Sequence, residues 1–168
     1  MNTHAKPREF APSGMDPGAL QVVRPKNRTY ALGLACEFSM TEPAFTQLGF
    51  ADWCQVLAGQ IARDHYFFVL DRDNTVVGFA GWALSDHESA SAWLEQSTNI
   101  TSDHCTDGDC VILNAWIARS PEVRKFMTAH GMRELSGKTH VFAKRIYPDG
   151  RMKPVKTLLS EVDPDLAQ

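Results

Sequence analysis

The stretch HYFFVLDRDNTVVGFAGWAL, residues 65–84, contains two apolar runs separated by five polar residues. The runs are rich in aromatic and β-branched side chains, which favour strands, and residues 71–75 have the composition of a turn. The pattern therefore predicts a β-hairpin. Because both runs are apolar on both faces, we expect the hairpin to lie inside a sheet and not at its edge.

Upstream of this hairpin, apolar residues recur at intervals of three and four over residues 29–40 and 45–62, which predicts two amphipathic helices. Residues 1–28 hold four prolines and two glycines, a composition that disfavours regular structure. We interpret them as an N-terminal arm, which is either a disordered tail or a segment that lies extended across a partner. One globular domain then covers residues 29–160, and residues 161–168 form a polar tail.

Downstream of the hairpin, Ser85 and Asp86 can cap a helix that ends near Ile100, and a buried strand follows over residues 110–118.

The next segment carries the end signals of a further helix. Ser120 can cap it, Pro121 suits its first position, and Gly131 is expected just past its end. Residues 138–159, with the turn PDGR, predict a second hairpin. The element order predicts an α/β (α+β) fold with a mixed, mostly antiparallel central sheet flanked by helices.

Composition limits the possible partners and locations. The chain has 168 residues, 43% of them hydrophobic, and a net charge of -3, so we expect no nucleic-acid partner. The four cysteines are unevenly spaced and no signal peptide is visible, which favours free thiols in the cytoplasm. No apolar run reaches the ~20 residues of a transmembrane helix. A peripheral place on a membrane complex stays open.

The usual catalytic motifs of nucleotide, zinc and serine enzymes do not occur in the sequence. The loop that holds His104, Cys105 and Cys110 fits no zinc spacing, so we expect no metal site. Elsewhere, His65, His130 and His140 read as packing or capping residues. Asn114 reads as a buried amide with structural hydrogen bonds.

The last third of the chain is basic. It reads as a solvated face or, alternatively, as a surface for an acidic protein partner. The residues concerned are Lys138, Lys144, Arg145, Arg151, Lys153 and Lys156.

Several of these segments together resemble the toxin-activating lysine acyltransferases of bacteria, which attach a fatty acyl group to lysines of a protoxin. The resemblance covers roughly residues 40–155. It rests on the hairpin with Arg72 and Asp73 in its turn, on Trp82, on GD at 108–109, on WIA at 116–118 and on KTHV at 138–141. It implies an acetyltransferase-like fold and an acyl carrier protein as the acyl donor, with no bound cofactor.

The resemblance also implies a catalytic histidine and aspartate, and both positions depart from the family pattern. The aspartate would immediately precede Trp116, where this chain has Ala115. The histidine would fall on Phe45 or Thr46, and no histidine occurs between His4 and His65. A lysine must lose a proton before it attacks a thioester, and the histidine would accept that proton. The absence of both catalytic residues therefore predicts weak or no turnover.

Three hypotheses follow. The leading one is a catalytically silent accessory or regulatory subunit of a larger bacterial assembly, contacted through arm 1–28 and the basic residues; a membrane respiratory complex is one candidate host. The second is an active acyl carrier protein-dependent lysine acyltransferase with a rearranged site, in which Asn114, His65, His87 or His104 substitutes for the missing pair. The third is a module that binds an acyl carrier protein or acyl chain without transfer. Whether the chain is an enzyme stays open at this point.

Overall fold

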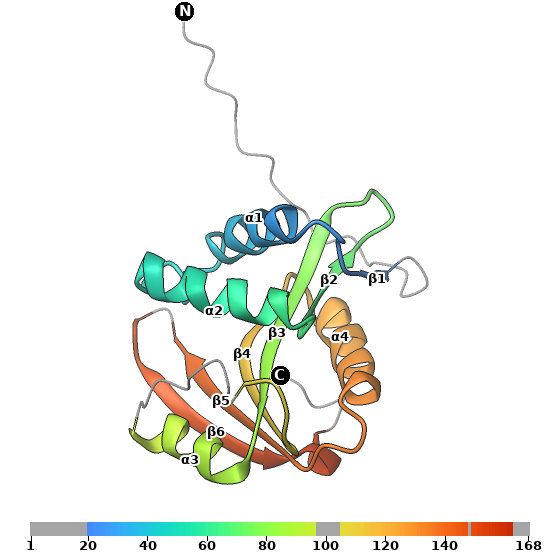
Figure 1. The fold of residues 1–168 in the computed structure, drawn as a ribbon. Coiled ribbons are helices and arrows are strands. Elements are labelled where there is room, and N and C mark those ends of the chain that lie inside the picture. Colours follow the sequence, from blue (N-terminus) through green and yellow to red (C-terminus); the bar gives the residue numbers. More distant parts are fainter. Residues whose placement is uncertain (1–19, 97–104, 148, 163–168) are drawn as a thin grey trace, which may run out of the picture.

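The computed structural model describes residues 20–96, 105–147 and 149–162 (Figure 1). Its elements follow in the order β1 (Gln21–Val23), α1 (Arg28–Ser39), α2 (Phe50–Ala62), β2 (Tyr66–Leu70), β3 (Val76–Ser85), α3 (His87–Gln96), β4 (Cys110–Ala118), α4 (Pro121–Glu134), β5 (His140–Ile146) and β6 (Met152–Leu158). A short 3-10 helix, Leu159–Glu161, follows β6.

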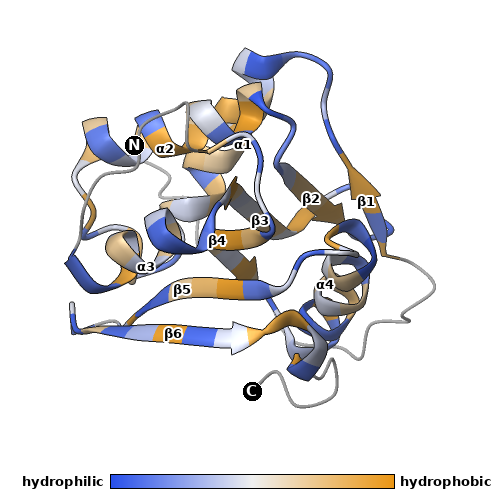
Figure 2. Ribbon diagram, turned by 60° about the horizontal axis from the view of Figure 1, so that its bottom comes forward, coloured by the Kyte–Doolittle hydropathy of each residue, from blue (hydrophilic) through white to orange (hydrophobic). Residues whose placement is uncertain are grey.

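The six strands form one sheet in the order β1-β2-β3-β4-β5-β6. Neighbouring strands are antiparallel except β4 and β5, which are parallel because α4 connects them as a crossover. Figure 2 shows α4 on one side of the strands and α1 and α2 on the other. The predicted fold class, a mixed and mostly antiparallel sheet flanked by helices, is therefore confirmed.

The hairpin at residues 65–84 is confirmed as β2 and β3. The Asp71 carboxylate accepts hydrogen bonds from the backbone N–H groups of Asp73 and Thr75, both at 2.9 Å, and these bonds fix the turn. Pairing of β2 with β1 and of β3 with β4 places the hairpin inside the sheet, as expected.

The start of α4 is confirmed, but its predicted end is wrong. The Ser120 hydroxyl accepts a hydrogen bond from the Val123 N–H, and Pro121 begins the helix. The helix then continues through Gly131 to Glu134. A Cβ atom at Gly131 would lie 3.1 Å from the Trp116 ring, so this glycine serves packing against β4 and does not end the helix.

The second predicted helix begins later than expected, at Phe50 instead of residue 45. Residues 41–48 form successive turns, with backbone bonds from Phe45 N–H to Glu42 and from Leu48 N–H to Phe45. These span three residues, so no continuous α-helix forms there. The predicted end of the third helix near Ile100 lies outside the described residues.

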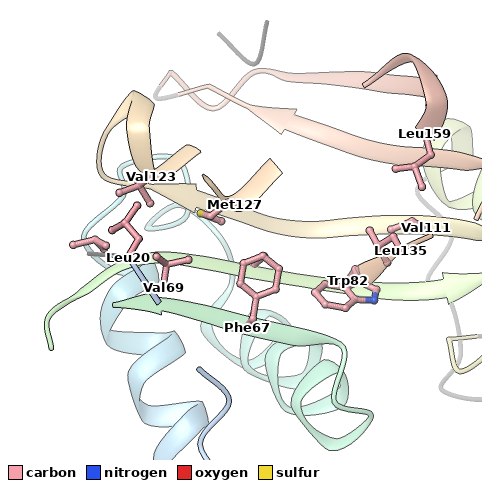
Figure 3. Close-up of a cluster of buried hydrophobic side chains, with 11 residues drawn as sticks. Leu20, Phe67, Val69, Trp82, Val111, Val123, Met127, Leu135 and Leu159 are labelled. Carbon is pink, nitrogen blue, oxygen red and sulfur yellow. The ribbon is translucent and has the colours of Figure 1, made fainter. Parts of the chain in front are cut away.

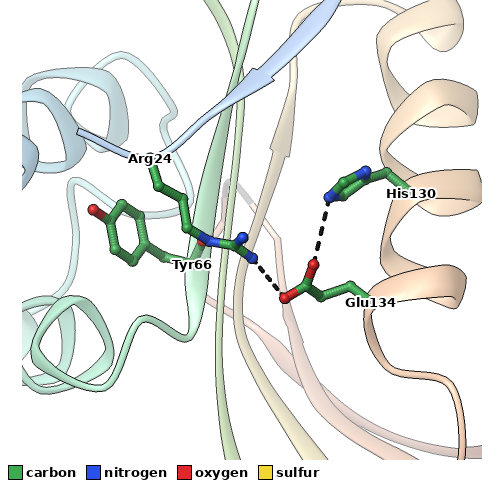
Figure 4. Close-up of polar contacts among 4 residues, drawn as sticks. All are labelled: Arg24, Tyr66, His130 and Glu134. Atoms are coloured by element: carbon green, nitrogen blue, oxygen red, sulfur yellow. Dashed lines mark hydrogen bonds and ion pairs between the residues drawn. The ribbon is translucent and has the colours of Figure 1, made fainter. Parts of the chain in front are cut away.

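Strand β1 lies in the segment interpreted as an irregular arm. Its Val22 pairs with Val69 of β2, and Leu20 is buried. Arg24 then donates one hydrogen bond to the Tyr66 carbonyl and another, at 2.7 Å, to Glu134 (Figure 4). Residues 20–24 therefore belong to the folded domain, because their side chains supply burial and hydrogen bonds.

Buried side chains form separate clusters on the two faces of the sheet. The cluster in Figure 3 lies between the sheet and α4 and includes Phe67, Trp82 and Met127. On the opposite face, a second cluster lies beneath α1 and α2, and a third packs against α3. Among the described residues, no helix is long and apolar enough to span a membrane.

Candidate functional site

Strand β4 contains one extra residue, Asn114. Leu113 pairs with Trp82 of β3, and Ala115 pairs with the preceding residue of β3, Gly81. Asn114 therefore has no direct partner and forms a β-bulge. Bulges bend a strand and redirect its side chains, and they occur often beside active sites.

The contact between β4 and β5 ends at this bulge. Their parallel pairing runs from Cys110 and His140 to Leu113 and Ala143. Beyond these residues β4 pairs only with β3, and β5 pairs only with β6. The facing edges of residues 114–118 and 144–146 thus share no ladder pairing.

A pocket of about 510 Å³ occupies this region. Its walls come from β4, β5, α4, the turns after α1 and the segment after β6. Most lining side chains are apolar, and they include Leu113, Trp116, Met132, Leu135, Val141, Leu159 and Val162. The charged ones are Glu42, Arg124, Lys144 and Arg145. An apolar pocket with a few charged groups suits a flexible, mainly aliphatic ligand with a polar end.

The positions at which the resemblance implies a catalytic histidine and aspartate, Phe45 or Thr46 and Ala115, lie around the pocket and the cluster beneath α1 and α2 as follows. Phe45 lines the pocket, and its ring centroid is 5.2 Å from that of Trp53. Ala115 is 1% exposed and belongs to the cluster beneath α1 and α2, against which Phe45 also packs. Thr46 is exposed, does not line the pocket, and donates a hydrogen bond to the Pro43 carbonyl.

A buried amide lies beside Ala115. Gln60 of α2 is fully buried, and neither its Oε1 nor its Nε2 atom has a hydrogen-bond partner among the described residues. A Cβ atom at Gly81 would lie 2.1 Å from the Gln60 Nε2 atom, so the amide fills the space above that glycine. Because Gly81 is the cross-strand partner of Ala115, both positions face the same polar group. Sequence periodicity gave no signal that the polar side chain of Gln60 is buried.

Of the proposed substitutes for the missing pair, Asn114 lines the pocket, but His65 and His87 do not. His65 lies against the Trp82 ring, and burial lowers its pKa. His87 lies against His140, and its Nε2 atom is 3.0 Å from the Lys156 Nζ atom. His104 lies outside the described residues.

The basic residues do not form one surface. Lys144 and Arg145 line the pocket; Lys144 lies 4.4 Å above the Trp93 ring, and burial lowers its pKa. Lys138 donates a 2.7 Å hydrogen bond to the Gly108 carbonyl. Arg151 pairs with Asp149 at 2.6 Å, and Lys153 is exposed.

The sequence interpretation missed a contact at the pocket wall. Arg119, directly after β4, pairs with Glu42 at 3.0 Å, donates to the Thr41 hydroxyl, and lies over the Phe38 ring. These bonds hold the turns after α1 against the end of β4. No local motif signals this contact, because Glu42 and Thr41 lie 77 and 78 residues before Arg119 in the chain.

The motifs GD and KTHV, which carry part of the resemblance, meet at the beginnings of β4 and β5, and Val141 of KTHV also lines the pocket. The Thr139 N–H donates to the Asp109 carbonyl at 2.7 Å, and Lys138 binds Gly108 as described above. Gly108 has a φ of 137°, and a Cβ atom there would lie 2.1 Å from the Ser85 carbonyl oxygen. These motifs therefore join the beginnings of β4 and β5.

No group of three or more histidine, cysteine, aspartate or glutamate side chains within residues 20–96, 105–147 and 149–162 could hold a metal ion.

The solved structures that are similar to this chain include a GNATL domain and an acetyltransferase. The loading GNATL domain of CurA from Lyngbya majuscula is 19% identical, with a TM-score of 0.45 over 77% of this chain and 68% of that chain. The histone acetyltransferase HPA2 and related acetyltransferase from Corynebacterium glutamicum is 14% identical, with a TM-score of 0.43 over 75% of this chain and 76% of that chain. No curated protein sequence matches the chain.

A family model gives the decisive match. The model for the RTX toxin acyltransferase family (HlyC) matches residues 24–156, which run from the residue after β1 into β6. This range includes both strands that border the pocket and the motifs that join them. The chain therefore belongs to the RTX toxin acyltransferase family.

Proposed function

We propose that this chain is an acyltransferase-like protein that binds an acyl group without transferring it and serves as an accessory or regulatory subunit of a larger bacterial assembly. The observation that carries the proposal is a pocket with an open strand edge but without an imidazole among its described lining residues. Apolar walls and charged side chains favour binding, whereas no described lining residue is a histidine that could move a proton.

Transfer to a lysine requires a base for the ammonium proton and an orienting group for that base. A histidine with a neighbouring carboxylate performs these roles in hydrolases and related enzymes. Here a phenyl ring lies at Phe45 and a buried methyl group at Ala115. Loss of a general base typically lowers a rate by about 10²- to 10⁴-fold. Asn114 can accept a hydrogen bond but cannot carry the proton away.

Glu42 is the carboxylate among the lining residues, and its contacts favour a structural role. Its Oε1 atom accepts from Arg119 at 3.0 Å, and Arg119 also binds Thr41. Glu42 therefore fixes the pocket wall and does not replace the histidine.

The pocket retains the features that an acyl thioester needs. Its apolar walls suit an aliphatic chain, and the unpaired edge of β4 can donate hydrogen bonds to a thioester carbonyl. Lys144 and Arg145 contribute to the pocket lining, and positive charge on this part of β5 favours an acidic donor such as an acyl carrier protein.

A transfer assay tests catalytic silence. Purified protein is incubated with radiolabelled acyl-acyl carrier protein and a lysine-containing acceptor. We expect carrier binding without measurable transfer, and we expect the variant Phe45→His/Ala115→Asp to gain transfer if the alignment with the family is correct. Transfer by the unmodified chain would refute silence and direct attention to His104 and the other histidines.

Charge-reversal variants test the binding step. The double variant Lys144→Glu/Arg145→Glu should lose carrier binding, whereas Arg72→Glu, in the exposed turn between β2 and β3 and outside the pocket lining, should keep it. Equal binding by both variants would contradict the assignment of the carrier to this pocket.

A native pull-down tests the accessory role. The tagged chain is recovered gently from soluble and membrane fractions, and the stoichiometry of its partners is measured. Recovery in a fixed ratio within one large complex, a membrane respiratory complex being one candidate, supports the proposal. Recovery as a free species with an acylated target would favour the active-enzyme alternative.

A further inference from the structure

Cys36 and Cys54 place two thiols side by side on neighbouring helices. Their Sγ atoms are 3.7 Å apart, and both residues are half-buried. Cys36 lies near the end of α1, and Cys54 lies near the start of α2. The two helices run next to each other in Figure 1.

We propose that Cys36 and Cys54 form a site of reversible oxidation, at which a disulfide bond ties the end of α1 to the start of α2. A disulfide has an S–S length of about 2.05 Å, so the two sulfur atoms must approach by about 1.7 Å. Rotation about χ1 of the two side chains can supply this approach. Partial exposure gives a small oxidant access to the pair.

The reaction needs a two-electron oxidant, for which a peroxide is sufficient. One thiolate attacks the peroxide, its sulfur becomes a sulfenic acid, and the leaving oxygen departs as water once protonated. The second thiolate attacks that sulfur, the S–S bond forms, and a second water leaves. Burial and the neighbouring Cys54 raise the pKa of Cys36 to about 11, which makes the thiolate scarce and the reaction slow at neutral pH.

The position of the pair links this chemistry to the pocket. The segment between the two helices, residues 40–49, contributes Glu42, Ala44 and Phe45 to the pocket wall. A bond between Cys36 and Cys54 would close the base of this segment. The oxidised form should therefore hold that wall more rigidly, independently of whether the pocket transfers an acyl group.

Peptide mapping of the full chain tests the inference. The protein is treated with hydrogen peroxide, alkylated after denaturation, digested and analysed by mass spectrometry. We expect a cross-link between the Cys36 and Cys54 peptides that disappears on treatment with dithiothreitol. Cys105 and Cys110 are buried, and they should remain alkylatable as internal controls.

Two further measurements make the test decisive. Oxidation should raise the melting temperature by about 5–10 °C, since a disulfide that closes a loop of this size restricts the unfolded chain. It should also slow amide hydrogen exchange over residues 40–49. The variant Cys54→Ser should show neither change. Sulfinic acid at Cys36, or a cross-link of either cysteine to Cys105 or Cys110, would overturn the assignment.

Discussion

Replacing Gln60 with methionine should stabilise the protein. The Gln60 side chain is fully buried on the inner face of α2, and neither polar atom of its amide has a hydrogen-bond partner among the described residues. Methionine has a similar length and shape, and its thioether does not need a hydrogen bond. The substitution therefore removes an unpaired polar group without opening a cavity.

The expected gain follows from the cost of the unpaired amide. Leaving a buried donor or acceptor unsatisfied costs about 1–3 kcal/mol. Imperfect packing of the new side chain against Gly81 offsets part of this gain, by about 1 kcal/mol. We expect the Gln60→Met variant to raise the free energy of unfolding by up to about 2 kcal/mol. For a chain of this size, each kcal/mol corresponds to roughly 2–4 °C in melting temperature.

Urea denaturation measures this change in the free energy of unfolding. An unchanged m-value would show that the variant exposes the same surface area on unfolding. The matched control is Gln55→Met, an exposed position on the same helix, which should change the free energy of unfolding by less than about 0.5 kcal/mol. Destabilisation of the Gln60→Met variant by more than about 1 kcal/mol would refute the reasoning. The amide would then have a partner in solution, such as a buried water molecule beside Ala115.

Two further predictions concern backbone geometry and pH. The variant Gly108→Ala should lower the free energy of unfolding by about 3 kcal/mol or more, because its Cβ atom would overlap the Ser85 carbonyl at a φ of 137°. Its control, Gly33→Ala, has open space on α1 and should stabilise by about 0.5–1 kcal/mol; equal effects in urea denaturation would contradict the clash. Burial lowers the pKa values of His65 and His130 in the folded protein, so the unfolded chain binds more protons just below pH 6.5. Stability should therefore fall as the pH is lowered from about 7 through 6.5 towards the folded pKa values, and the double variant His65→Gln/His130→Gln should show a shallower fall in urea midpoint. An unchanged slope would assign the pH dependence to other groups.

The sequence predicted the elements whose signals are local. The hairpin around residues 71–75 follows from its turn residues and apolar arms, and the start of α4 follows from Ser120 and Pro121. Elements set by distant contacts were missed or misplaced. Strand β1 has three residues and depends on pairing with β2, and Gly131 lies inside α4 because Trp116 packs against it.

At the candidate site, too, local features were predicted from the sequence and features that depend on distant contacts were not. Asn114 was recognised as unusual in an apolar strand, but its bulge depends on register with β3, which a single strand does not reveal. Phe45 was placed at the pocket through the resemblance alone. No pattern in the sequence pointed to Gln60 or Arg119. Gln60 is notable because its buried amide has no hydrogen-bond partner among the described residues, and Arg119 is notable because it pairs with Glu42, which is distant in the chain.

The joint formed by Gly108, Asp109, Lys138 and Thr139 has a consequence for how such chains are recognised. These residues hold the beginnings of β4 and β5 together, and this role does not depend on the side chains at the far ends of the same strands. The motifs at this joint therefore report how β4 and β5 begin, and they do not report what the pocket does at the far ends of the same strands. A match to these motifs identifies the architecture, whereas the chemistry has to be established from the residues that line the pocket.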